Sequence, residues 1–271
     1  MPIHPTAIVH RGAEIDATAD IGPFCVIGPR VKIGPHTRLI SHVVVDNHTT
    51  LGARNVVHPF ASLGGNPQDL KFKGEPARLL VGNDNVIRES ATLNIGTEGG
   101  HMQTTLGDGC LLMAYAHIAH DCRVGNGVVL ANAVSLAGHV DIGHHAILGG
   151  LAAVHQFTRI GRMAFIGGGA MVAQDVLPFC IAQGDRAQIA GVNVVGLKRS
   201  GWSRDRIAAV RRAVKALFAP DQARQAALEA VETEQAPHAP EIAELCQFVR
   251  SAQRGVCSMR RGLGGSDADE L

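Results

Sequence analysis

Residues 116–125 read A-H-I-A-H-D-C-R-V-G, with two histidines three positions apart and an aspartate directly after the second. This spacing suits three kinds of site: a metal centre, a general base with its orienting carboxylate, or solvated surface histidines with no function. His117 and His120 fall on a chain that we expect to be extended, where such a spacing does not turn both rings toward one ion, so we predict no metal. A carboxylate such as Asp121 that fixes the tautomer of a neighbouring imidazole gives a general base that works near neutral pH.

A strict six-residue repeat runs through the chain around this segment. Stepping by six from Ile3 to Leu63 meets only aliphatic residues, and the same is true from Leu106 to Val172. A six-residue period fits neither a helix nor a simple strand alternation, but it is typical of a parallel β-helix in which three hexads make a coil of about 18 residues. Glycines such as Gly22 often follow the aliphatic residue, which predicts corners that need a positive φ or a close backbone approach.

Residues one coil apart stack at roughly 4.8 Å along the axis of such a fold. His120 then lies under Gly138 and Gly138 under Gln156, while Asp121 lies under His139. A glycine beside the base leaves its N–H unobstructed for a developing oxyanion. Such an arrangement would suit acyl transfer, in which His120 removes a proton from an acceptor hydroxyl or amine and Gly138 holds the thioester carbonyl oxygen. Asp121 can orient His120 only if the chain turns there, because strand neighbours point to opposite faces.

Segments outside the repeat give the domain organisation. Two of them, near residues 64–80 and 96–105, predict loops thrown out from the coil. The repeat fades after Pro178, and helical apolar patterns follow, the first with Ser203 as its N-cap and others around 221–233 and 239–252. We expect an all-β fold, a parallel β-helix over 1–190, then a small α-helical domain over 191–255 and a disordered tail over 256–271.

Composition excludes several classes of partner. The formal charge of +1 gives no reason to expect nucleic acid. The chain has neither a leader-like N-terminus nor an apolar run of membrane-spanning length, so we expect a cytoplasmic protein rather than an integral membrane protein. The six cysteines form no C-x-x-C pair and suggest reduced thiols. Three of them fall on small core positions of the repeat: Cys25, Cys110 and Cys122.

The motifs QDLK, GEP, AHIAHDC, LAGHV, GGLAAVHQF, VAQDV, AQG and GVNVVGLKRSG, in this order, resemble the acyl-[acyl-carrier-protein]–UDP-N-acetylglucosamine O-acyltransferase family over about residues 3–250. The resemblance implies a left-handed parallel β-helix, a hand that the usual crossover rule does not predict. It implies a homotrimer that moves a 3-hydroxyacyl chain from acyl carrier protein to the glucosamine 3-position of UDP-N-acetylglucosamine, the first step of lipid A biosynthesis. No cofactor and no metal are implied.

The resemblance also assigns roles by position. His120 becomes the general base, Asp121 its orienting carboxylate and Gly138 the oxyanion donor. It implies that a larger set binds the sugar nucleotide: Asp69, Lys71, His117, His139, His155, Gln156, Asn193 and Arg199. It implies an acyl-chain pocket formed by Leu70, Ala137, Gly150 and Gly168. Gly168 has no side chain, which leaves room for a long acyl chain. Because acyl carrier proteins are acidic, basic residues should steer docking, with these candidates: Lys198, Arg199, Arg204, Arg206, Arg211, Arg212 and Lys215.

The chain departs from the family pattern at four positions. Asn94 and Ile95 stand where many members have a histidine and an arginine, Val195 where an acidic residue is common, and Ser200 where a second arginine is frequent. These changes bear on nucleotide affinity and on the sugar. Some relatives acylate a 3-amino sugar nucleotide, so N-acylation stays open beside the default O-acylation, as does another hexapeptide-repeat acyltransferase.

Three further hypotheses make different predictions. The N-acyltransferase of the same pathway carries an additional N-terminal uridine-binding domain, for which hexads that begin at Ile3 leave no room. A carbonic anhydrase on this fold would need three convergent zinc histidines. A non-catalytic scaffold predicts that His120→Ala changes no acyl-transfer activity.

Overall fold

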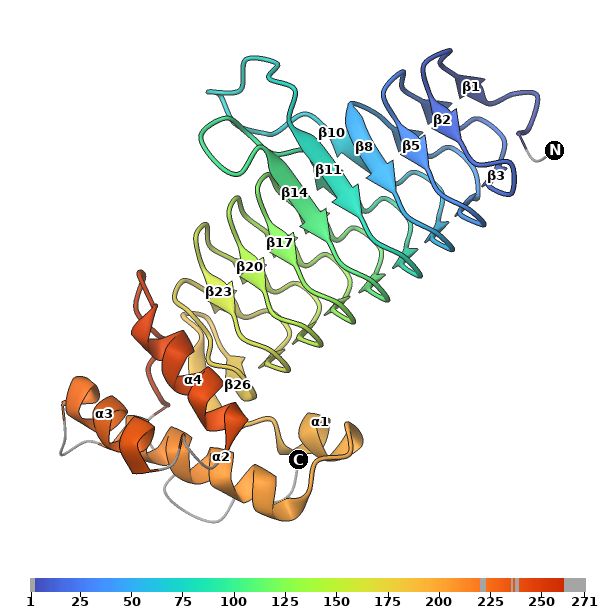
Figure 1. Cartoon of the computed structure of the whole chain (residues 1–271). Coiled ribbons are helices and arrows are strands. Elements are labelled where there is room, and N and C mark those ends of the chain that lie inside the picture. Colours follow the sequence, from blue (N-terminus) through green and yellow to red (C-terminus); the bar gives the residue numbers. More distant parts are fainter. Residues whose placement is uncertain (1–2, 220–222, 235, 237–238, 261–271) are drawn as a thin grey trace.

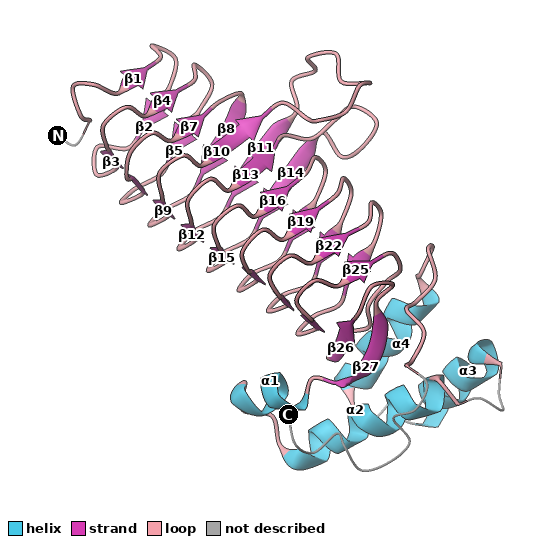
Figure 2. Cartoon of the chain, turned by 180° about the vertical axis from the view of Figure 1, so that it is seen from behind, coloured by secondary structure: helices cyan, strands magenta, loops and turns pink. Residues whose placement is uncertain are grey.

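The computed structural model describes residues 3–219, 223–234, 236 and 239–260. In this part of the chain, short strands wind into a prism with three parallel sheets as its walls, and helices cover its C-terminal end (Figures 1 and 2). The expected class, a β-helix of hexapeptide repeats followed by a helical region, is confirmed.

Each wall takes one strand from each coil. Sheet B consists of β1 (Ile8–Val9), β4 (Val26–Ile27), β7 (Val44–Val45), β10 (Ser62–Gly65), β13 (Thr92–Asn94), β16 (His117–Ile118), β19 (Ser135–Leu136), β22 (Ala153–Val154) and β25 (Met171–Val172). Sheet C consists of β2 (Glu14–Ile15), β5 (Lys32–Ile33), β8 (His48–Leu51), β11 (Arg78–Val81), β14 (Gln103–Leu106), β17 (Arg123–Val124), β20 (Asp141–Ile142) and β23 (Arg159–Ile160). Sheet A consists of β3 (Asp20–Ile21), β6 (Arg38–Leu39), β9 (Val56–Val57), β12 (Val86–Ile87), β15 (Leu111–Leu112), β18 (Val129–Leu130), β21 (Ile147–Leu148), β24 (Phe165–Ile166), β26 (Cys180–Gln183) and the antiparallel β27 (Gln188–Val192).

The repeat produces this architecture because the aliphatic residue of each hexad closes its strand and points inward. In sheet B, Ile118 pairs with Leu136 and Leu136 with Val154, and all three side chains are buried. The strand residue before each aliphatic one points outward and is exposed or half-buried. This row of inward aliphatic side chains fixes the register of the strands, because a slip of one residue would expose the whole row.

Close backbone approach, not positive φ, explains the glycines that follow the aliphatic residues. A Cβ on Gly22 would lie 1.8 Å from the carbonyl oxygen of Ile40, so no side chain fits there. Positive φ falls two residues later in the hexad, at Phe24 (58°), His42 (52°) and Phe60 (66°). The expectation of a positive φ at these glycines is therefore wrong, and that of a tight approach is confirmed.

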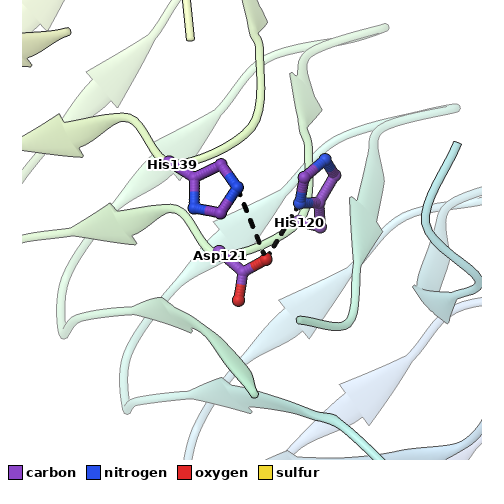
Figure 3. Close-up of side chains that lie close together, drawn as sticks. All are labelled: His120, Asp121 and His139. Carbon is purple, nitrogen blue, oxygen red and sulfur yellow. Dashed lines mark hydrogen bonds and ion pairs between the residues drawn. The ribbon is translucent and has the colours of Figure 1, made fainter. Parts of the chain in front are cut away.

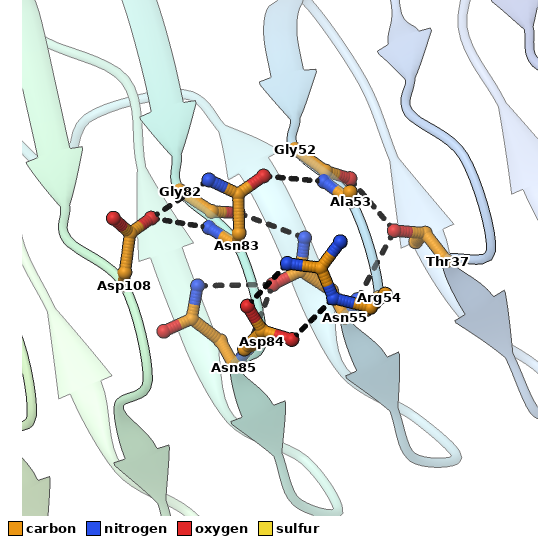
Figure 4. A network of polar contacts seen from close by, with 10 residues as sticks. All are labelled: Thr37, Gly52, Ala53, Arg54, Asn55, Gly82, Asn83, Asp84, Asn85 and Asp108. Atoms are coloured by element: carbon orange, nitrogen blue, oxygen red, sulfur yellow. Dashed lines mark hydrogen bonds and ion pairs between the residues drawn. The ribbon is translucent and has the colours of Figure 1, made fainter.

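A buried polar ladder follows the corner between sheets C and A (Figure 4). The Asn55 amide donates to the carbonyl of Gly82, and Asn85 donates to Asn55 Oδ1 from both its backbone (3.0 Å) and its side chain (2.9 Å). The backbone N–H of Cys110 then donates to Asn85 Oδ1 at 2.7 Å. These bonds join residues 25, 27 and 30 positions apart. They keep the stacking intact across the two coils that carry loops.

Two loops leave the prism side by side, as Figure 1 shows above β11 and β14. They span residues 66–77 and 95–102, which is shorter than the expected 64–80 and 96–105, because β10, β11 and β14 extend into those ranges. The backbone N–H of Glu98 donates to Glu75 Oε1 at 3.3 Å and ties one loop to the other.

The helical region consists of α1 (Val194–Arg199), α2 (Arg204–Leu217), α3 (Arg224–Glu234) and α4 (Pro240–Arg250). The expected N-cap of α2 is confirmed, since Ser203 Oγ accepts from the N–H of Arg206. The short helix α1 was not predicted by the apolar pattern. No helix among the described residues is long and apolar enough to cross a membrane.

An arginine joins α4 to the prism. Arg159 on β23 donates to the buried Asp175 carboxylate and to the carbonyl of Phe248, and its guanidinium lies 4.3 Å from the centre of the Phe248 ring. Residues 256–260 then return to the prism, with bridges from Val256 to Asp175 and from Met259 to Ile189. The expectation of a disordered tail is wrong for 256–260, whose residues Val256 and Cys257 are buried. Residues 261–271 lie outside the described residues.

Candidate active site

His120 and Asp121 occupy the corner between sheets B and C, just after β16. Asp121 has a φ of 59°, so the chain turns at this point and both side chains lie on the same side. His120 Nδ1 lies 2.9 Å from Asp121 Oδ2 (Figure 3). An ionised carboxylate only accepts hydrogen bonds, so Nδ1 is the donor in this pair, and in the neutral form of the ring Nε2 has a lone pair. This is the arrangement that a histidine general base needs.

The Asp121 carboxylate is fully buried and is held by donors from the 95–102 loop. Its Oδ1 accepts from the backbone N–H groups of Thr97 (3.1 Å) and His101 (2.7 Å), and its Oδ2 accepts from the Thr97 hydroxyl (2.6 Å). Burial alone would raise the pKa of Asp121, but the hydrogen bonds from His120, Thr97 and His101 outweigh burial and hold that pKa well below its usual range. The carboxylate is therefore ionised at neutral pH. No sequence pattern points to Thr97 or His101, because their loop follows no period.

Gly138 lies directly against the ring of His120, as the coil length predicted. A Cβ on Gly138 would meet His120 Cε1 at 2.5 Å and Nε2 at 2.6 Å. Among the described residues no acceptor takes the Gly138 N–H. The absence of a side chain thus gives the imidazole its place and leaves a backbone donor beside it.

Two further histidines border the pair, and both are kept neutral. His139 stacks on Phe157 with ring centroids 4.4 Å apart, and its Nε2 lies 4.0 Å from Asp121 Oδ2. Burial lowers the pKa of His139, against the opposing effect of Asp121. Burial also lowers the pKa of His117, whose Nδ1 lies 2.7 Å from the Thr92 hydroxyl.

The remaining predicted positions are more exposed, and Gly150 and Gly168 lie at the corner between sheets A and B, not at the corner of His120. His155 Nδ1 lies 3.0 Å from the carbonyl oxygen of Gln156, and both side chains are exposed. Gly168 stacks on Gly150, where a Cβ on Gly168 would lie 3.3 Å from the Gly150 carbonyl oxygen. Ala137 is half-buried one residue before Gly138.

The 66–77 loop carries Asp69, Leu70 and Lys71 out from the prism. Leu70 is fully exposed in the single chain, so its predicted pocket is not formed by this chain alone. Asp69 lies near enough to His139 to raise the pKa of that ring, in opposition to burial. Asn94 anchors the base of the loop, because its amide donates to the carbonyls of Gly65 (3.4 Å) and Asn66 (3.1 Å).

Asn193 and Arg199 lie apart from this cluster, on α1 at the helical end of the prism. Asn193 is buried; its amide donates to the Met163 carbonyl, and its Oδ1 accepts from the N–H of Gly196 to cap α1. Arg199 is exposed in the last turn of the same helix. Within one chain the structure does not bring either residue to His120.

The site is poorly suited to two other chemistries, metal binding and thiol nucleophilic catalysis. The ligating atoms of His120, Asp121 and His139 lie within 4.8 Å of one another, which a metal ion could use. Both Asp121 oxygens already accept hydrogen bonds, however, and the Nδ1 of His120 is one of the donors. Cys122 is no nucleophile, since it is buried in the core and burial raises the pKa of its thiol to about 12.

The hexapeptide β-helix places the chain in the class of hexapeptide-repeat transferases. Residues 103–138 match the family model of bacterial transferase hexapeptide repeats. Residues 175–257 match the model of UDP-N-acetylglucosamine O-acyltransferase, domain 2.

Whole-chain comparisons identify the family. An acyl-[acyl-carrier-protein]–UDP-N-acetylglucosamine O-acyltransferase of Thermodesulfovibrio yellowstonii is 47% identical over 255 residues, 94% of this chain and 98% of that protein. The corresponding protein of Myxococcus xanthus is 49% identical over 254 residues, with the same coverage. The chain therefore belongs to the acyl-[acyl-carrier-protein]–UDP-N-acetylglucosamine O-acyltransferase family.

Solved structures agree with this assignment. The structure of LpxA from Acinetobacter baumannii superimposes on this chain with a TM-score of 0.92 at 42% identity, and the match covers 94% of this chain and 99% of that one. The UDP-N-acetylglucosamine acyltransferase of Arabidopsis gives a TM-score of 0.83 at 32% identity, covering 94% and 100%.

Proposed function

We propose that the protein transfers a 3-hydroxyacyl chain from acyl carrier protein to the 3-hydroxyl of the glucosamine in UDP-N-acetylglucosamine, the first step of lipid A biosynthesis. The observation that carries this proposal is the His120–Asp121 pair, with its 2.9 Å hydrogen bond, packed against Gly138. The chain belongs to a family of O-acyltransferases, which favours a sugar hydroxyl over a 3-amino group as the acceptor.

The geometry suggests how the residues divide the reaction. His120 Nε2 takes the proton of the sugar hydroxyl as that oxygen attacks the thioester carbonyl, and Asp121 stabilises the imidazolium that forms. The Gly138 N–H donates to the oxyanion of the tetrahedral intermediate. His120 then returns its proton to the thiolate of the leaving carrier protein. This mechanism needs no cofactor and no metal, so dialysis against a chelator should leave the rate unchanged.

Membership of the family also supports the roles proposed for the binding residues around His120 and Asp121. Asp69 contacts the sugar and Lys71 the phosphates, from the loop whose base Asn94 anchors. A further group lines the sugar-nucleotide and acyl pockets: Leu70, His117, Ala137, His139, Gly150, His155, Gln156 and Gly168.

An acyl-transfer assay tests the function. Purified protein is given 3-hydroxyacyl carrier proteins of several chain lengths with UDP-N-acetylglucosamine or its 3-amino analogue. We expect turnover with the hydroxyl acceptor and a loss of at least about a hundredfold in His120→Ala. Robust turnover by His120→Ala would remove the general base, and turnover with only the 3-amino acceptor would replace O-acylation by N-acylation.

A homotrimer would complete the site. The outward residues of sheet A from β9 onward are apolar, and they are Val56, Val86, Leu111, Val129, Ile147 and Phe165. A contiguous apolar surface on a regular prism favours assembly with further copies. Assembly would let Asn193 and Arg199 of one copy meet the uridine end of a nucleotide held by another. Analytical ultracentrifugation of wild type and Ile147→Glu measures this; a monomeric wild type at micromolar concentration would contradict it.

Location in the cytoplasm is supported by the thiols. The six cysteines are all free and all buried. Unpaired cysteines are the rule in reducing compartments.

A further inference from the structure

The Asp121 carboxylate has two histidines within reach and is hydrogen-bonded to only one of them. Its Oδ2 lies 2.9 Å from Nδ1 of His120 and 4.0 Å from Nε2 of His139 (Figure 3). The two rings are perpendicular, with centroids 5.0 Å apart. A shift of Oδ2 by about 1 Å toward His139 would bring His139 Nε2 within hydrogen-bond distance. Which histidine the carboxylate binds matters, because without Asp121 the His120 ring is not held in the tautomer that a general base needs.

Donors from the 95–102 loop leave the carboxylate one open position. A carboxylate offers about four acceptor sites, two on each oxygen. Backbone N–H groups of Thr97 and His101 fill both sites on Oδ1, and the Thr97 hydroxyl fills one on Oδ2. A single site on Oδ2 remains for an imidazole N–H.

Thr97 determines where that site points. It is the one described residue that donates to both carboxylate oxygens, through its N–H and through its hydroxyl, so it fixes the plane of the group. Gly100 presses on the carboxylate from the same loop, since a Cβ there would lie 2.2 Å from Asp121 Cγ. Thr97 is itself 5% exposed, and its carbonyl accepts from Gly100 and Met102, which closes the loop into a rigid turn.

We propose that Thr97 is a positioning residue, whose hydroxyl assigns the Asp121 carboxylate to His120 rather than to His139. The inference rests on the proposed function, in which His120 is the base. The backbone N–H and the hydroxyl of Thr97 both donate to Asp121, so Thr97 acts through that carboxylate. The loop that interrupts the repeat thus has a purpose in the site: it closes over the carboxylate and aims it.

Thr97→Val tests the hydroxyl, because valine keeps the shape and the backbone N–H and removes the one side-chain donor. The first readout is the ¹⁵N spectrum of histidine-labelled, substrate-free protein at about pH 8, where the imidazoles are neutral. In wild type the His120 ring should be the Nδ1–H tautomer. In Thr97→Val a substantial fraction should convert to the Nε2–H tautomer, while Thr97→Ser keeps the wild-type spectrum.

Thr92→Val is the matched control for the spectrum. It removes a hydroxyl that contacts His117 one coil away, and it leaves Asp121 untouched. It should leave the His120 tautomer unchanged. Gly100→Ala gives an independent second variant, since the added methyl group must displace the carboxylate, and it should shift the tautomer in the same direction as Thr97→Val.

Kinetics supply the second readout. We expect Thr97→Val to lower kcat about tenfold, with KM for the sugar nucleotide changed less than about twofold, and Thr97→Ser to recover most of the loss. A His120 tautomer that is unchanged in both Thr97→Val and Gly100→Ala would overturn the inference, whatever the activity. Full activity of His120→Ala would instead overturn the proposed function, so the two failures are separate.

Discussion

Gly138 and His120 are in contact across one coil, with the α-carbon of the glycine against the imidazole ring. The space for a Cβ is already taken by Cε1 and Nε2 of His120, at 2.5 and 2.6 Å. The pair is 18 residues apart in the sequence and adjacent in space. The missing side chain of Gly138 therefore leaves space for the His120 ring, and the N–H of the glycine lies beside that ring.

Gly138→Ala should inactivate the enzyme without unfolding it. The methyl group must push the His120 ring aside, and a displacement of about 1 Å at a reacting group costs about a hundredfold in kcat. The assay is acyl transfer with UDP-N-acetylglucosamine. Gly99→Ala is the control, because a Cβ there meets nothing within 4 Å; it should keep its activity. Equal activity of the two variants would argue against any role for the missing side chain at Gly138.

Gly168→Met should shift the preference of the enzyme toward shorter acyl donors. Gly168 is exposed at the corner between sheets A and B, and a Cβ there stands 3.3 Å from the Gly150 carbonyl oxygen, so a side chain fits with a small adjustment. The ratio of kcat/KM for long and short 3-hydroxyacyl carrier proteins is the measurement. Gly168→Ala should give a smaller shift in the same direction. Unchanged chain-length preference in both variants would place the end of the acyl chain elsewhere.

Acidification should destabilise the fold in two stages. Burial lowers the pKa values of His117 and His139, so they stabilise the fold while neutral, and this contribution is lost as pH falls from about 6.5 through their native pKa values. Asp121, whose native pKa is also lowered, contributes fully above its unfolded pKa of about 3.9 and loses that contribution at still lower pH.

Urea unfolding at a series of pH values measures both stages. In His117→Gln/His139→Gln the slope of the free energy of unfolding between about pH 6.5 and 5 should fall, by at most about 1.4 kcal/mol per pH unit for each histidine removed. The stage below about pH 4 should persist in this variant. An undiminished first stage would mean that other groups, such as His48, govern it.

Charge reversal on α2 should weaken the use of the carrier protein. Arg204, Arg212 and Lys215 are exposed there, whereas Arg206 is paired with Glu241 and packs on Trp202. Arg204→Glu/Arg212→Glu should raise KM for the acyl carrier protein severalfold, and the difference should shrink at high salt because surface charges are screened. KM for the sugar nucleotide should not change.

The control for α2 is Arg11→Glu, an exposed residue at the opposite end of the prism. It changes the net charge in the same direction without touching the helical region. A comparable rise in KM for Arg11→Glu would indicate a general effect of charge rather than a docking surface.

Much of this site could be predicted from the sequence because the fold is periodic. Once the hexads set the coil, Gly138 had to stack on His120 and His139 on Asp121, and the structure has these contacts. Asp121 can orient His120 only if the chain turns between them, and the φ of 59° at Asp121 provides that turn. The residues that bind substrate and the acyl chain remain predictions, which the experiments above address.

Tertiary structure alone decided what lies off the period. Thr97 and His101 reach Asp121 from a loop whose length shifts the phase, so no fixed spacing identifies them. The same holds for Val256 and Met259, which return to the prism from beyond the helices. The periodic sequence thus determined that Gly138 lies against His120, since every coil repeats the same geometry. The folded chain determined how the carboxylate is held, because an irregular loop finds its contacts only by packing against a surface that already exists.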